Sequence, residues 1–150
     1  MIDYEPILAK VVGLISPDIQ LFKSQLIVVP PAVREEPYLH TDSGTLGRVR
    51  NANASQPLML SVQYFLTPLL DESMGNFTYV PGSHRLDFPI DPDNLAGRQS
   101  DGYVQGRHIE GRVQLRVDAG DTVIFPHSLW HGVSANTSHT ARKTLIYSYS

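Results

Sequence analysis

The residues of this chain with the clearest potential for chemistry are His40 and Asp42, which are separated by one residue. In an extended segment, residues two apart project from the same face, so an imidazole nitrogen and a carboxylate oxygen could reach one small cation. His131, near the C-terminal end, offers a third ligand. Two histidines and one carboxylate on one side of a metal leave its other side open for substrate and oxygen. The sequence therefore predicts a metal site formed by His40, Asp42 and His131.

Two other interpretations of these residues stay open from the sequence. A His-x-Asp pair is a short motif, and it also occurs as a hydrogen-bonded pair on the surface of a strand. His127 precedes His131 by only a few positions and competes with it for the role of metal ligand. A packed or capping histidine is an alternative at either position.

The composition limits the kinds of site and partner. A chain of 150 residues is expected to form a single domain, residues 1–150, with a substantial core. It has no cysteine, so a metal must be held by nitrogen and oxygen. The net charge is −3 and no basic run occurs, which argues against a nucleic-acid partner. There is no apolar run of the ~20 residues that a membrane span needs and no signal-peptide pattern at the start, so we expect a cytoplasmic protein without a membrane partner.

The hydrophobic pattern predicts one helix followed by many short strands. Apolar residues recur at helical spacing over residues 4–15, and Ser16-Pro17 should end that helix. Alternating or β-branched runs predict strands over residues 19–29, 58–67, 76–80, 112–117, 122–125, 129–135 and 142–149. Residues 43–57 and 85–111 have little periodicity and are predicted to be long surface loops that determine the substrate. Together these elements indicate an all-β sandwich or barrel with a helical cover.

Further motifs stand at separated places along the chain. They are Pro30-Pro31 before His40-Thr41-Asp42, the run from Gly75 to Arg85 that contains Pro81-Gly82-Ser83-His84, Gly120-Asp121 leading into Phe125-Pro126, His131-Gly132, and Arg142-Lys143. In these segments, from about Asp18 to Tyr149, the chain resembles the phytanoyl-CoA dioxygenase (PhyH-like) family of Fe(II)/2-oxoglutarate-dependent oxygenases. The resemblance implies a mainly β double-stranded β-helix, the cupin-like jelly roll, with a short N-terminal helix. The resemblance also leads us to expect that this domain lacks much of the helical segment that usually precedes it in the family.

The resemblance also implies roles for particular residues. His40, Asp42 and His131 would be the catalytic iron ligands, and Arg142 would pair with the distal carboxylate of the co-substrate 2-oxoglutarate. Gln25 and Tyr64 fall where family members line the co-substrate pocket. The implied reaction is hydroxylation of a small molecule by O2, with release of succinate and CO2.

Two other functions remain as alternatives. One is a non-catalytic or truncated jelly-roll module that binds a metal or ligand, and the other is a cupin-like metalloenzyme that does not use 2-oxoglutarate. With only one helix to cover a sheet, we also expect an exposed apolar patch that favours a homo-oligomer.

Overall fold

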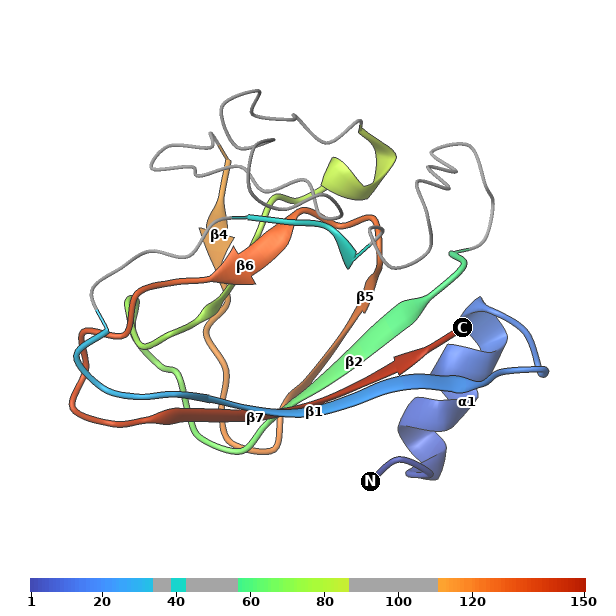
Figure 1. Cartoon of the computed structure of the whole chain (residues 1–150), viewed down its shortest axis with the longest axis horizontal. Helices are drawn as coiled ribbons and strands as arrows, with labels where there is room; N and C mark the ends of the chain where they lie inside the picture. The colour runs from blue at the N-terminus through green and yellow to red at the C-terminus, as the bar shows by residue number, and fades with distance from the viewer. Residues whose placement is uncertain (34–38, 43–56, 87–110) are drawn as a thin grey trace.

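The structure, a computed structural model, describes residues 1–33, 39–42, 57–86 and 111–150 (Figure 1). The predicted loops at 43–57 and 85–111 lie almost entirely outside these residues. The elements, in chain order, are α1 (Glu5–Leu14), β1 (Leu21–Val29), β2 (Leu60–Phe65), β3 (Phe77–Tyr79), the short 3₁₀ helix η2 (Ser83–Arg85), β4 (Val113–Gln114), β5 (Thr122–Pro126), β6 (His131–Val133) and β7 (Arg142–Tyr149).

The strands form two antiparallel sheets. The larger sheet has the order β1-β7-β2-β5, and the smaller has the order β4-β3-β6. The two sheets face each other across the interior, and α1 lies against the outer side of the larger sheet (Figure 1). The predicted mainly β jelly roll with one short N-terminal helix is confirmed.

The two faces of the larger sheet differ in character because successive side chains of a strand point to opposite sides. On β2, Val62 and Tyr64 point outward and pack against Val11 of α1. Ser61 and Gln63 point into the interior, where both are buried. The larger sheet therefore has an apolar outer side under the helix and a partly polar inner side.

An aromatic core fills the space between the two sheets. Its buried members come from both sheets and from the connections between strands, and they are Phe65, Leu69, Phe77, Phe125 and Leu129. The rings of Phe77 and Phe125 have centroids 4.8 Å apart. This core closes one part of the interior and leaves the inner face of β1 and β7 to line a pocket.

No helix within residues 1–33, 39–42, 57–86 and 111–150 combines the length and the apolar character needed to cross a membrane.

Candidate metal centre

His40 and His131 are brought together by backbone pairing. They form an isolated antiparallel bridge, in which the His40 amide donates to the His131 carbonyl at 2.8 Å and the His131 amide donates back at 2.9 Å. The expected extended His-x-Asp segment is only partly right, because Asp42 already lies in a helical turn. The Asp42 amide donates to the His127 carbonyl at 2.8 Å, and this bond holds Asp42 beside the two histidines.

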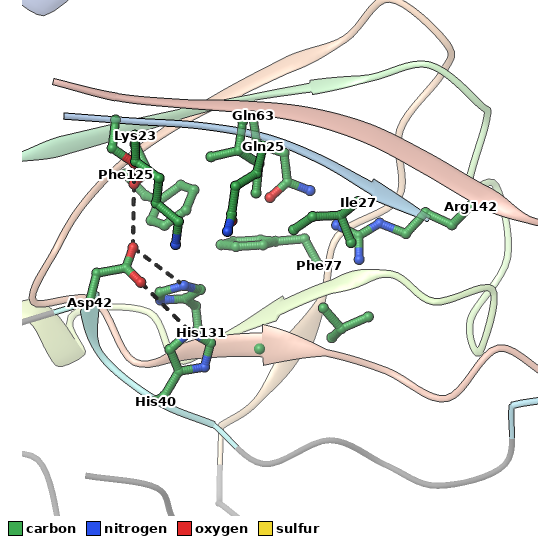
Figure 2. Close-up of a pocket in the computed structure, with 15 residues that line it drawn as sticks. Lys23, Gln25, Ile27, His40, Asp42, Gln63, Phe77, Phe125, His131 and Arg142 are labelled. Carbon is green, nitrogen blue, oxygen red and sulfur yellow. Dashed lines mark hydrogen bonds and ion pairs between the residues drawn. The ribbon is translucent and has the colours of Figure 1, made fainter. Parts of the chain in front are cut away.

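The three predicted ligands converge on one point (Figure 2). The Nε2 atom of His40 lies 3.7 Å from Oδ1 of Asp42, and Nε2 of His131 lies 3.8 Å from Oδ2. One ligand atom from each residue falls within 4.8 Å of the others. Ser61 on β2 donates to Oδ2 of Asp42 at 3.3 Å and exchanges a 2.9 Å hydrogen bond with Ser148, so the carboxylate is also tied to the sheet.

His131 is held in a form suited to metal binding. Its Nδ1 lies 2.9 Å from the Leu129 carbonyl, so a proton on Nδ1 leaves the Nε2 lone pair facing Asp42. The ring lies near Phe77 and Phe125, with centroid distances of 5.5 and 4.7 Å. Burial is the main cause that lowers the pKa of His131, against the opposing effect of Asp42. The imidazole is therefore neutral at neutral pH, as a ligand must be.

His127, the competing candidate, is not part of this cluster. It is buried, and its Nδ1 lies 3.3 Å from the Met59 carbonyl. Burial lowers the pKa of His127 as well. Its backbone carbonyl accepts the hydrogen bond from Asp42, so its contact with the site runs through the main chain.

The cluster opens into a pocket that runs along the inner face of the larger sheet. Gln25 and Gln63 lie next to the cluster, Ile27 and Phe77 come next, and Arg142 stands at the far end (Figure 2). The pocket thus passes from metal-ligating atoms through apolar side chains to a cation.

Arg142 is the most unusual side chain of the pocket. It is only 1% exposed, and its Nε and Nη1 have no hydrogen-bond partner within the described part of the chain. Burial lowers its pKa to about 10, so the guanidinium still carries its charge at neutral pH. Gly75, at φ +75°, lies against its stem, since an added Cβ would be 3.4 Å from Arg142 Cδ. A buried charge without a partner costs several kcal/mol, which points to an anionic ligand.

The two predicted co-substrate contacts have different outcomes. Gln25, on the inner face of β1, lines the pocket. Tyr64 does not, because it follows Gln63 on β2 and therefore points to the outer face. Its hydroxyl donates to the Met1 carbonyl at 3.2 Å. The assignment of Tyr64 to the pocket is corrected accordingly.

Sequence reasoning missed four polar residues of the pocket, Lys23, Ser61, Gln63 and Ser148. The Nε2 of Gln63 is buried and has no hydrogen-bond partner among the described residues. A signal was present in β2, where Ser61 and Gln63 interrupt an otherwise apolar strand at alternate positions. In a strand that is buried on both faces, polar side chains at alternate positions indicate that one face lines an internal cavity, because buried polar groups need partners.

Solved structures share this fold. HygX from Streptomyces hygroscopicus, crystallised with nickel, 2-oxoglutarate and hygromycin B, has a TM-score of 0.73 and 18% identity, over 97% of this chain and 61% of that one. The nickel complex of the non-heme monooxygenase ThoJ has a TM-score of 0.68 and 21% identity, over 97% of this chain and 49% of that one. The chain thus spans between about half and two-thirds of the length of these structures.

No curated protein matched the chain. The family model of phytanoyl-CoA dioxygenase (PhyH), in contrast, matches residues 6–144, which is nearly the whole chain. With the jelly roll and the His40, Asp42 and His131 cluster in place, this match shows that the chain belongs to the phytanoyl-CoA dioxygenase (PhyH) family.

Proposed function

We propose that this chain is an Fe(II)- and 2-oxoglutarate-dependent dioxygenase domain that hydroxylates a small molecule. The observation that carries the proposal is the pairing of two features in one pocket. A two-histidine, one-carboxylate cluster stands at one end, and the buried guanidinium of Arg142, whose Nε and Nη1 have no hydrogen-bond partner among the described residues, stands at the other.

The cluster fits iron by its donor set. Two imidazole nitrogens and one carboxylate oxygen are the protein ligands typical of non-haem Fe(II) oxygenases, which keep the remaining positions open. The hydrogen bonds to His131 and Asp42 described above hold the ligands in orientation, as outer partners of metal ligands do. HygX, which shares this fold, has been crystallised with iron bound, and this supports the choice of metal.

The rest of the pocket fits 2-oxoglutarate from one end to the other. The keto acid has a chelating end, two methylene groups and a distal carboxylate. The cluster would hold the first, Ile27 and Phe77 would contact the methylenes, and Arg142 would receive the carboxylate. A guanidinium can donate two parallel hydrogen bonds to a carboxylate, which would satisfy the buried Nε and Nη1 of Arg142.

Iron and 2-oxoglutarate, when bound, would supply the oxidising chemistry for O2-dependent hydroxylation, with the keto acid converted to succinate and CO2. The residues of the chain do the remaining work. Arg142 orients the co-substrate, while Phe77 and Phe125 keep water from the buried side of His131. Asp42 keeps its place at the cluster through Ser61, so the ligands are arranged before the metal arrives.

The test is a titration of 2-oxoglutarate into anaerobic, Fe(II)-loaded protein, followed by the visible charge-transfer band of the chelated keto acid. We expect a saturable band, and succinate after oxygen is admitted. Protein that binds iron but gives no band would contradict the proposal and favour a metal-binding module or a metalloenzyme without a keto acid.

A further inference from the structure

The pocket contains a second cation, Lys23 on β1, which is not used in the proposed binding of 2-oxoglutarate. Lys23 lines the pocket at the end where Asp42 lies, whereas Arg142 stands at the opposite end (Figure 2). It is exposed rather than buried, and within the described residues its ammonium group has no ion pair or hydrogen bond. A flexible, solvated ammonium beside an open metal site is placed to meet an incoming molecule.

The backbone of β1 changes at this residue. The pairing with β7 shifts between Leu21, opposite Tyr149, and Lys23, opposite Ser148, so Phe22 is an extra residue in the strand. Bulges of this kind are common next to active sites, where they redirect a side chain. Lys23 is the first residue of the regular strand to face inward, on the same row as Ser148 and Ser61.

The charges of the pocket leave an excess of one positive charge for a third ligand. Among the described lining residues, Lys23 and Arg142 are cationic and Asp42 is a carboxylate. A divalent metal and a doubly negative keto acid cancel each other. The remaining positive charge lies at Lys23, since Arg142 is satisfied by the distal carboxylate.

We propose that Lys23 binds an anionic group of the substrate, a carboxylate or a phosphate, and so selects anionic small molecules for this site. The inference rests on the proposed function. Lys23 would hold the anion at the mouth of the pocket, beside the metal, and leave the neighbouring C–H bonds of the substrate directed to the open coordination side.

The experiment uses the full chain loaded with nickel and saturated with 2-oxoglutarate, so that no turnover occurs. Phenylacetate, its neutral analogue phenylacetamide and phenyl phosphate serve as probes, and binding is measured by calorimetry. The wild-type protein should bind at least one of the two anions more tightly than the amide. The anion that binds more tightly shows whether the site prefers a carboxylate or a phosphate. Lys23→Gln should weaken binding of the preferred anion by about tenfold without changing the affinity for phenylacetamide. Lys23→Arg should retain the preference.

Lys143→Gln is the matched control. Lys143 is exposed and stands opposite Val28 on the neighbouring strand, on the outer face of the sheet, so this variant removes the same charge without touching the pocket. It should keep the preference for anions.

Three results would overturn the role of Lys23. An unchanged preference for anions in Lys23→Gln would show that the anion binds elsewhere. A loss of 2-oxoglutarate affinity in that variant would assign Lys23 to the co-substrate. If Lys23→Gln self-associated but bound the probes like the wild-type protein, the role of Lys23 would be to prevent edge-to-edge strand pairing. Failure of the wild-type protein to bind 2-oxoglutarate at the loading step would instead count against the proposed function.

Discussion

His40 and His131 exchange two backbone hydrogen bonds, of 2.8 and 2.9 Å, and their rings lie with centroids 4.4 Å apart. His40 lies in a short segment between β1 and β2, and His131 is the first residue of β6. Because the main chains are paired at these residues, the distance between the two imidazoles is set by the ladder geometry. The backbone pairing of the jelly roll therefore sets the positions of two of the three predicted metal ligands.

Replacing His131 with Ala should weaken nickel or iron binding by more than about 100-fold, because one of three ligands is lost. Isothermal titration of the anaerobic protein measures this. His139→Ala, which removes an exposed histidine, is the control and should bind metal normally. If His127→Gln lost the metal and His131→Ala retained it, the third ligand would have to be His127.

Replacing Arg142 with Ala should weaken 2-oxoglutarate binding by roughly 30-fold or more, since an unpaired buried carboxylate costs on the order of 2–5 kcal/mol. Arg142→Lys should recover only part of this loss, because an ammonium keeps the charge without the bidentate fork. Titration of the charge-transfer band gives the affinity, and iron binding should be unchanged. Arg116→Ala, at an exposed arginine that pairs with Glu72, is the control. Wild-type keto-acid affinity in Arg142→Ala would remove Arg142 from the site.

Replacing Gly75 with Ala should disturb Arg142 in addition to straining the backbone. Gly75 and Gly82 have nearly the same φ, +75° and +79°, but only a Cβ at Gly75 would contact Arg142 and Val29. Both variants should lose about 1–2 kcal/mol in urea unfolding, the cost of a left-handed non-glycine residue. Only Gly75→Ala should also bind 2-oxoglutarate several-fold more weakly. Equal keto-acid affinity in the two variants would show that the stem of Arg142 adapts.

The metal-free protein should lose stability as the pH falls below about 6.5. Burial lowers the pKa of His127 and of His131, so between the folded and unfolded pKa values these histidines bind protons more readily in the unfolded chain than in the folded protein. The two histidines do not reduce the free energy of unfolding above their unfolded pKa. As the pH falls from there toward the folded pKa values, the free energy of unfolding decreases by at most about 1.4 kcal/mol per pH unit for each histidine. Urea unfolding at pH 7.5 and 5.5 measures the loss. His131→Asn should make the dependence shallower, and an unchanged slope would exclude His131 as a source.

The outer face of β1 should promote self-association. Leu26 and Val28 are 63% and 51% exposed on this strand, which lies at the edge of the described sheet. Leu26→Lys should therefore shift the protein toward the monomer in sedimentation velocity runs at several concentrations. Leu70→Lys is the control, because Leu70 is a leucine of similar exposure, 55%, that lies outside the strands, and this variant should have little effect. A wild-type protein that stays monomeric at every concentration would contradict the expectation.

Local patterns in the sequence determined the elements and the ligand types. Period-two alternation and β-branched runs predicted β1 and β7 closely, and Ser16-Pro17 marked the end of α1, since these signals act within a few residues. The absence of cysteine limited a metal site to nitrogen and oxygen ligands. His40, Asp42 and His131 were identified because the spacing of His-x-Asp is local and the family motifs supplied the distant histidine.

Only the tertiary structure decided which side of each strand meets the pocket and which charged side chains are buried. Tyr64 and Gln63 are neighbours on β2, and the placement of α1 over one face made Tyr64 part of the helix contact and Gln63 part of the cavity. The bulge at Phe22 depends on pairing with β7, so the inward direction of Lys23 was not visible in the chain alone. The family resemblance implied a co-substrate role for Arg142, but the sequence did not show that its side chain is buried. This burial, with Nε and Nη1 lacking hydrogen bonds within the part of the chain that the structure describes, arises from packing between residues far apart in the sequence, and local patterns carry no information about such contacts.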